Sequence, residues 1–159
     1  MPNYAFIDSQ NVHLSIRDQG WVLDWKRFRI YLRDKYSVKK AFIFIGYVPA
    51  NEFLYTSLQE AGYVLVFKTT LQMRSGDRMV IKGNVDAELV LHTMIEWNNF
   101  DEAVIVTGDG DFYCLVRYLM VHSKLHRLLI PDKQKYSRLF LEFTSVITYL
   151  NRLHEKNRH

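Results

Sequence analysis

Three features of the sequence predict a single α/β domain with a mostly parallel sheet of about five strands. Short apolar runs alternate with segments of helical periodicity along the chain. Residues 41–45 are apolar at every position, which is typical of a strand buried on both faces of a sheet. The chain has 159 residues, enough for one domain with a sizeable core. We expect the domain to span residues 1–150, followed by a basic C-terminal tail at residues 151–159.

The first half of the chain alternates between strands and helices. Asp24 is a suitable N-cap for the segment that it opens, in which Phe28 and Leu32 keep the spacing of a core-facing side. Gly62 is suited to end another helix. The order strand, helix, strand, helix, strand favours parallel pairing through right-handed crossovers. The expected strands are residues 4–7, 40–48 and 63–67, with a turn or helix at 12–18 and helices at 24–35 and 51–61.

The second half of the chain begins with a departure from this alternation. Residues 69–82 hold two short apolar stretches around a turn-rich centre, which predicts an extended hairpin or flap. Residues 111–121 give the clearest helical pattern, with apolar side chains at positions i, i+3, i+4, i+7 and i+8. Further helices are expected at residues 84–97 and from Ser137 onward, and further strands at residues 103–107 and 125–130.

The composition excludes several kinds of protein. Cys114 is the one cysteine, so an internal disulfide and a thiolate zinc cage are excluded. Its neighbours Tyr113 and Leu115 lead us to expect a buried thiol without a catalytic role. No apolar run approaches the ~20 residues that cross a bilayer, and the first residues enter a strand without a signal peptide. We therefore expect a cytoplasmic protein with no membrane partner, and the sequence leaves room for a homo-oligomer.

Four acidic side chains follow predicted strands or open a predicted helix: Asp8, Asp86, Asp109 and Asp111. Parallel strands place their carboxyl ends at one edge of the sheet, and ligands bind in the crevice outside that edge. Carboxylates that meet there repel one another, and a bound divalent cation is the usual remedy. All-oxygen ligands suit Mg²⁺ or Mn²⁺, whereas zinc prefers histidine or cysteine. The sequence therefore predicts a Mg²⁺ or Mn²⁺ site for phosphate chemistry.

Each aspartate also has a structural explanation when it is considered alone. Asp111 is a natural helix N-cap, and Asp86 lies in a first turn where negative charge suits the helix dipole. Asp8 could satisfy backbone amides at the start of the next helix. Helix capping explains these residues one at a time, whereas a metal site explains all four together. Gly108 and Gly110 would then leave room for a metal or a phosphate close to the backbone.

Basic residues are in moderate excess: the formal charge is +4 and the pI is near 9.1, which permits a nucleic-acid partner. A site that cuts a polyanion needs basic side chains along the flanking backbone. Lys82 could contact a substrate phosphate, pair with a carboxylate or stay solvated at a strand end. Other candidates for contact with a nucleic-acid backbone are Arg74, Arg78, Lys133, Lys135 and Arg138, each of which alone would be an ordinary surface charge.

Three segments around the aspartates form an ordered set of motifs. Residues 6–11 read F-I-D-S-Q-N, residues 82–86 read K-G-N-V-D, and residues 106–112 read V-T-G-D-G-D-F. They resemble the F-I-D-x-x-N, K-G-x-D (here with one extra residue) and S/T-G-D-x-D-F elements of NYN domains. NYN domains are the LabA-like branch of the PIN nuclease superfamily. Pro131 and Ser137 resemble the closing segment of that family, so the resemblance spans nearly the whole chain.

The resemblance implies a three-layer α/β/α PIN-like fold, related to the Rossmann fold, and a Mg²⁺- or Mn²⁺-dependent ribonuclease acting on RNA. It implies that Asn11 orients Asp8 or a metal-bound water, where a simple capping role is the alternative. It also implies that Thr107 supports the turn that follows it. The metal ligands and catalytic carboxylates that the motifs indicate are Asp8, Asp86, Asp109 and Asp111.

One position departs from the family pattern. Six residues after the aspartate of the second motif, NYN domains commonly have another aspartate, and this chain has His92. Because histidine is a poorer ligand for Mg²⁺, the change would weaken metal binding or shift the preference toward Mn²⁺. Alternatively, His92 pairs with Glu88 or Glu96, one helical turn to either side, and is structural, which is the interpretation we favour.

The sequence favours one function and leaves alternatives. The first hypothesis is a metal-dependent ribonuclease that cleaves single-stranded or structured RNA. The alternative is a catalytically weak or inactive module that binds RNA or protein and retains the acidic site, and His92 is the feature in its favour. An aspartyl phosphatase is disfavoured because Asp109 and Asp111 follow the fourth predicted strand rather than the first. No phosphate-loop motif supports nucleotide binding of that kind.

Overall fold

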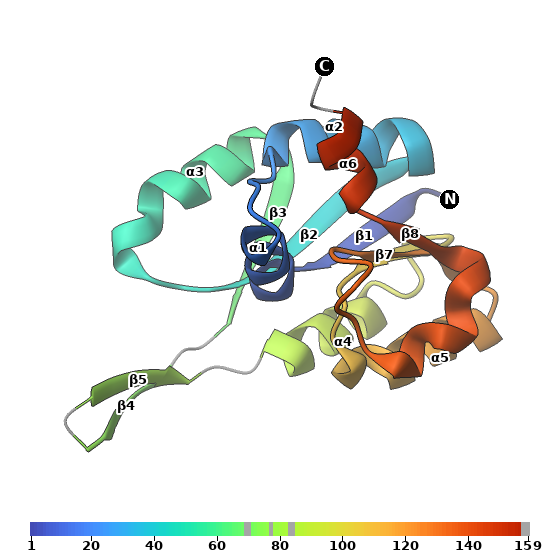
Figure 1. The fold of residues 1–159 in the computed structure, drawn as a ribbon. Coiled ribbons are helices and arrows are strands. Elements are labelled where there is room, and N and C mark those ends of the chain that lie inside the picture. Colours follow the sequence, from blue (N-terminus) through green and yellow to red (C-terminus); the bar gives the residue numbers. More distant parts are fainter. Residues whose placement is uncertain (69–70, 77, 83–84, 157–159) are drawn as a thin grey trace.

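The computed structural model describes residues 1–68, 71–76, 78–82 and 85–156 and has a six-stranded parallel sheet at its centre (Figure 1). The strand order is β3-β2-β1-β6-β7-β8, and each neighbouring pair is parallel. The α/β class and the parallel pairing are therefore confirmed. The strands are β1 (Asn3–Asp8), β2 (Val38–Gly46), β3 (Tyr63–Lys68), β6 (Ala103–Val106), β7 (Leu125–Ile130) and β8 (Ile147–Tyr149).

Helices cover both faces of the sheet and give the fold three layers (Figure 1). One face packs against α1 (Ser9–Asp18), α2 (Trp25–Tyr36), α3 (Glu52–Glu60) and α6 (Asn151–Lys156). The other packs against α4 (Val85–Ile95), α5 (Tyr113–Val121) and the 3₁₀ segment η3 (Arg138–Val146). Alternation along β1 shows why two cores form: Ala5 and Ile7 point to the first group, and Tyr4 and Phe6 to the second.

The number of strands differs from the prediction of about five, because β8 was not foreseen. This strand has three residues and directly follows the helical pattern of η3, so its own pattern is too short to recognise. The expected helix at residues 111–121 also begins differently: the 3₁₀ turn η2 (Gly110–Phe112) precedes α5. A second 3₁₀ turn, η1 (Pro49–Asn51), leads into α3.

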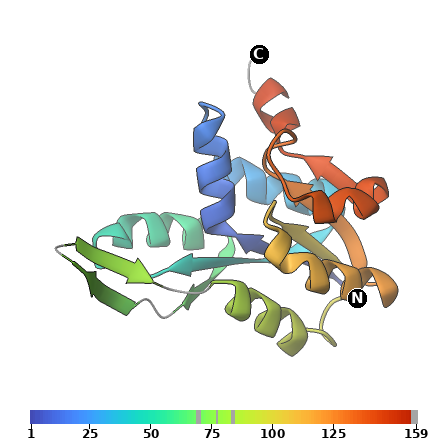
Figure 2. The same ribbon diagram turned by 60° about the horizontal axis from the view of Figure 1, so that its bottom comes forward.

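The hairpin expected within residues 69–82 is present as a separate two-stranded sheet. Strands β4 (Leu71–Ser75) and β5 (Arg78–Lys82) pair antiparallel. They project from the body of the domain beyond β3 and α3 (Figure 2). The hairpin therefore extends the surface on the side of the sheet where β3 forms the edge.

Cys114 is exposed, so the expectation of a buried thiol was wrong. The buried face of α5 is formed by Leu115, Val116 and Leu119, which leaves position 114 on the outer side of the helix.

Among the helices that the structure describes, none combines the length and the apolar character that crossing a bilayer requires.

The segment beginning at residue 151, which we expected to be a basic tail, starts with helix α6. The side chain of Leu153 packs against the first core, and the His154 ring stacks on Trp21 with 5.0 Å between the ring centroids. The Asn151 side-chain oxygen Oδ1 accepts a hydrogen bond from the Lys133 backbone N–H at 3.1 Å. Its amide nitrogen donates to the Gln19 side-chain oxygen at 2.7 Å. These contacts join α6 to the end of α1 and to the loop after β7.

Strand order reverses between β1 and β6, because β1, β2 and β3 extend the sheet in one direction and β6, β7 and β8 in the other. In open parallel sheets, such a reversal opens a crevice outside the carboxyl ends of the two central strands. Asp8 is the last residue of β1, and Asp109 follows the end of β6 after two intervening residues. The fold therefore brings two of the predicted metal ligands to the crevice.

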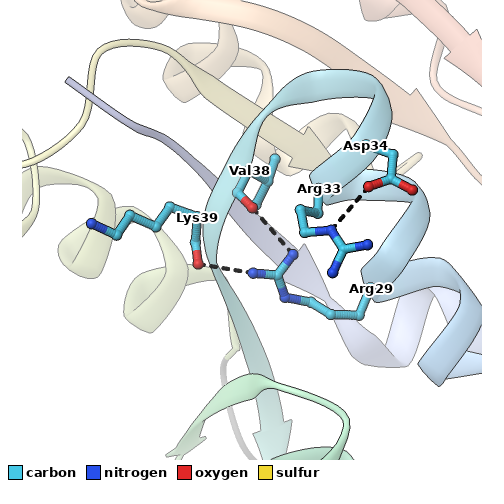
Figure 3. Close-up of polar contacts among 5 residues, drawn as sticks. All are labelled: Arg29, Arg33, Asp34, Val38 and Lys39. Atoms are coloured by element: carbon cyan, nitrogen blue, oxygen red, sulfur yellow. Dashed lines mark hydrogen bonds and ion pairs between the residues drawn. The ribbon is translucent and has the colours of Figure 1, made fainter.

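Arg29 of α2 joins its helix to the start of β2 (Figure 3) and to the residue before β3. Its guanidinium donates hydrogen bonds to the backbone carbonyl of Val38 at 3.2 Å, of Lys39 at 2.8 Å and of Gly62 at 3.3 Å. These carbonyls lie at the start of β2 and immediately before β3. The neighbouring Arg33 instead pairs with the adjacent Asp34 at 2.9 Å, with both side chains 63% exposed (Figure 3).

We predict that Arg29→Ala lowers the free energy of unfolding by about 2 kcal/mol, because it removes charged donors from backbone carbonyls at two strand starts. Arg33→Ala is the matched control and should change the free energy by less than about 0.5 kcal/mol, since an exposed ion pair contributes little. Urea unfolding of both variants measures the difference. Equal effects would contradict a bridging role for Arg29.

Candidate metal centre

Asp8 ends β1 and is also the N-cap of α1. One carboxylate oxygen accepts a hydrogen bond from the Asn11 backbone N–H at 3.3 Å, and the other accepts from the Thr107 hydroxyl at 3.0 Å. The side chain is buried, and this burial raises the pKa of Asp8, while the bonds from Asn11 and Thr107 oppose the rise. Asp8 is therefore held in one orientation at a position where its charge is costly.

Thr107 and Asn11 lock the loop after β6 to the start of α1. The Thr107 side chain is fully buried, and its hydroxyl accepts a hydrogen bond from the Asp109 backbone N–H at 3.1 Å. The Asn11 side-chain oxygen accepts from the Gly108 backbone N–H at 2.8 Å. Thr107 thus lies where a residue supporting the turn should lie. Asn11 touches Asp8 through its backbone and the loop through its side chain.

Three carboxylates from three elements meet at the crevice. Asp109 caps η2, where its side chain accepts a hydrogen bond from the Asp111 backbone N–H at 2.9 Å. Asp86 is the second residue of α4. One oxygen each from Asp8, Asp86 and Asp109 lies within 4.8 Å of the other two. Ligand oxygens on one hard cation lie about 2.0–2.6 Å from the ion, so this spacing and this all-oxygen set fit a single divalent cation.

The electrostatics of the cluster also fit a cation site. Burial, followed by the nearby charges of Asp109 and Asp8 and a hydrogen bond with Asp111, raises the pKa of Asp86 to about 6. Repulsion among carboxylates is what a bound cation relieves. Asp111 itself is exposed and stands outside the group of three, beside Asp86. Three of the four predicted ligands therefore lie close enough together to hold one cation, and the fourth lies beside Asp86.

Lys68 belongs to the same site and was missed in the sequence. It is the last residue of β3, its side chain is buried, and the charges of Asp8 and Asp86 act on it. Burial lowers the pKa of the Lys68 ammonium, and the two carboxylates counteract that effect. We ended the strand at residue 67 and began the flap at residue 69, so Lys68 was assigned to neither. Its place directly after the apolar run at residues 63–67 was the available signal, because it puts the lysine at the same sheet edge as Asp8.

His92 does not form the predicted ion pair. Among the described side chains, neither Glu88 nor Glu96 pairs with it, and its buried Nδ1 has no hydrogen-bond partner there. The ring instead packs edge-on against Phe44 of β2, with 5.6 Å between the centroids. His92 also lies outside the group of three carboxylates. His92 lies on the side of α4 that faces the sheet, so its imidazole packs against the core.

Gly108 and Gly110 make room for another loop of the protein. A Cβ atom at Gly110 would lie 2.8 Å from the Ser137 Cβ, and one at Gly108 would lie 3.4 Å from the Tyr136 Cβ. The Ser137 backbone N–H donates to the Gly108 carbonyl at 3.1 Å. We expected these glycines to make room for a metal or phosphate. The structure shows that the loop between β7 and η3 fills that space.

The predicted nucleic-acid contacts fall into two groups. Lys133 and Lys135 are exposed on the loop that packs against Gly108 and Gly110, and Arg138 is exposed at the first residue of η3, directly after that loop. Arg74, Arg78 and Lys82 belong to β4 and β5, and their side chains lie outside the described part of the structure.

The fold is an α/β domain with a parallel sheet, and an acidic group lies at the carboxyl ends of its central strands. The family model of the NYN domain matches residues 4–151, and the chain therefore belongs to the NYN domain family. The resemblance seen in the motifs is confirmed.

The relatives agree with this assignment. The chain is 25% identical over 123 residues to the low amplitude and bright protein LabA of Synechococcus elongatus, which supports the LabA-like branch. This match covers 67% of the chain and 61% of LabA, so the chain spans less than two thirds of that relative. The crystal structure of a protein of unknown function from Vibrio parahaemolyticus has the same fold, with a TM-score of 0.76 and 20% identity. That similarity covers 94% of the chain and 92% of the Vibrio protein.

We predict that Asp86→Asn stabilises the metal-free protein above pH 6. The pKa of Asp86 is raised from 3.8 to about 6, so folding favours its protonated form. That contribution is complete below about pH 4 and is lost as the pH rises through about 6. Because Asp86 is partly exposed, we expect a gain on the order of 1 kcal/mol at pH 8 and little change at pH 4.

Unfolding of the metal-free protein between pH 4 and pH 8 measures this effect. Asp101→Asn is the control, because Asp101 is exposed and precedes β6, at the opposite end of the strand. A pH profile that is the same in wild type and Asp86→Asn would refute the repulsion in the cluster.

We predict that Thr107→Val lowers Mn²⁺ affinity about tenfold, because Asp8 loses the hydroxyl that orients it. The free energy of unfolding should fall by about 1–3 kcal/mol, since buried polar partners are left unsatisfied. Thr107→Ser keeps the hydroxyl and should retain most of the affinity. Calorimetric titration with Mn²⁺ distinguishes the two variants. Equal Mn²⁺ affinities of Thr107→Val and Thr107→Ser would show that the hydroxyl has no part in metal binding.

Proposed function

We propose that this protein is a divalent-metal-dependent ribonuclease that hydrolyses RNA phosphodiesters at its aspartate cluster. The observation that carries this proposal is the meeting of three carboxylates, Asp8, Asp86 and Asp109, within 4.8 Å at the switch point of the sheet. Membership of the NYN domain family supports it, because NYN domains resemble PIN nucleases. We place the catalytic domain in residues 1–150 and leave open its assembly as a homo-oligomer.

The carboxylate donors fit Mg²⁺ or Mn²⁺, which Asp8, Asp86 and Asp109 would hold with Asp111 beside them. When bound, such a cation polarises a phosphoryl oxygen and lowers the pKa of a coordinated water. Hydrogen bonds within the protein orient the ligands without a metal, because Thr107 and Asn11 fix Asp8 and the loop of Asp109. Pre-set ligands reduce the reorganisation that binding requires.

Basic side chains on the rim support RNA as the substrate. Lys133, Lys135 and Arg138 are exposed next to the turn that presents Asp109. Exposed lysine and arginine side chains attract a phosphate backbone without a requirement for sequence. In the proposed complex, these residues hold the strand while the carboxylate cluster faces the scissile phosphate.

A second function has one observation in its favour. Lys68 places a positive charge beside Asp8 and Asp86 and so partly balances the carboxylates without a metal. This arrangement suits a catalytically weak or inactive module that binds RNA or protein and retains the acidic site. Binding of RNA with a steep salt dependence, and no cleavage with either Mg²⁺ or Mn²⁺, would favour this alternative over the nuclease.

We predict that Asp8→Asn and Asp109→Asn each lower Mn²⁺-dependent cleavage of single-stranded RNA by about a thousandfold or more, because each removes a ligand charge. The assay follows an end-labelled oligoribonucleotide, with circular dichroism to verify folding. Asp101→Asn serves again as the matched carboxylate control and should cleave at the wild-type rate. Equal cleavage by wild type and both cluster variants would identify the activity as a contaminant.

A further inference from the structure

We propose that a groove between α1 and α3 binds the nucleoside adjacent to the scissile phosphate, with Lys68 contacting the phosphate at its inner end. The groove has a volume of about 630 Å³. Its walls come from the start of α1, the loop before α2, the carboxyl end of β2 and the inner side of α3. This volume falls in the range of sites for small organic ligands, about 300–1,000 Å³. The inference rests on the proposed function, because it names how that same site holds its substrate.

The groove adjoins the acidic cluster through two of its lining residues, Ser9 and Lys68. Ser9, which lines it, directly follows Asp8 in the chain. Lys68 lines it as well, and this lysine is close enough to Asp8 and Asp86 for their charges to act on its ammonium. A ligand that fills the groove therefore ends beside the carboxylates. A phosphate attached to that ligand would lie between the cluster and Lys68.

The lining has the chemistry of a nucleobase site. Leu54, Leu58 and Trp25 supply apolar surface for the faces of a base. Gln10, His13 and Asn51 supply polar groups that suit the edges of a base and the ribose hydroxyls. A base has this same combination, with flat apolar faces and a polar rim.

The charges along the groove also fit a nucleoside joined to a phosphate. Among the described residues that line it there is no aspartate or glutamate, and Lys68 is cationic. Together with the divalent cation that the proposed function places on the carboxylates, Lys68 would favour an anionic ligand at the inner end. A nucleoside joined to a phosphate satisfies both halves of the site, whereas a cationic or wholly apolar ligand satisfies only one.

The first test is nuclear magnetic resonance of the whole protein in Mg²⁺, titrated with adenosine 5′-monophosphate, which has no diester to cleave. We expect shifts at Gln10, His13, Asn51 and Leu54. Ribose 5-phosphate lacks the base and should shift Lys68 but leave Asn51 and Leu54 unchanged. Shifts confined to the loop at residues 131–137, or no binding of the monophosphate, would overturn the proposal.

The second test uses substitutions at the two ends of the groove. Leu54 is 39% exposed, so Leu54→Gln preserves the fold while removing apolar contact, and we expect about fivefold weaker binding of adenosine 5′-monophosphate. Leu141→Gln, at an exposed leucine of η3, is the control and should bind as wild type. Lys68→Met should weaken both adenosine 5′-monophosphate and ribose 5-phosphate, about tenfold each.

Hydrolysis of bis(4-nitrophenyl) phosphate separates this inference from the proposed function, because that diester has no nucleoside. Leu141→Gln, outside the groove, should hydrolyse it in Mn²⁺ at the wild-type rate. A wild-type protein that fails to hydrolyse it, yet binds the monophosphate in the groove, would refute the nuclease and support the groove. A protein that hydrolyses it, with monophosphate binding unaffected by Leu54→Gln, would refute the groove alone.

Discussion

β1 and β6 lie side by side in the sheet, yet the strands that follow each of them extend the sheet in opposite directions. The register pairs Ile7 with Val106, so the residues that follow, Asp8 and Thr107, arrive at the edge together and form a hydrogen bond. The bond from Gly108 to Asn11 then ties the next loop to the next helix. Asp8 and Asp109 take their places from this pairing, and α4 adds Asp86.

The cluster reduces stability locally, and the two cores around the sheet compensate for it. Asp8 and Lys68 are buried charged groups, and burial disfavours the ionised form of both. The strands that support them are apolar on both faces: Phe6 and Ile7 are each fully buried, on opposite sides of β1. This rigid framework keeps the carboxylates close together despite their repulsion. A ligand site needs side chains that are fixed in this way.

Much of the fold and of the cluster could be predicted because both depend on strand ends. Apolar runs mark where β1 and β6 stop, so Asp8 and Asp109 could be assigned to one edge before the structure was known. Lys68 could not, because the strand was predicted to end one residue early, which left Lys68 between the strand and the flap. β8 has too few residues for a pattern, and the packing of His92 on Phe44 depends on the rotation of α4 against the sheet, which spacing along a helix does not specify.

Asn151 helps to hold the loop after β7 next to α1. Its side chain connects Gln19, at the end of α1, with Lys133, on the loop after β7. Gln19 also donates to the Pro131 carbonyl at 2.9 Å, so the two links bracket the start of the loop that packs against Gly108 and Gly110. A chain shortened to residue 150 would retain every carboxylate of the cluster but lose this brace. The acidic edge would then keep its carboxylates but lose one support of the adjoining loop, so the first turn of α6 helps to hold this edge in place.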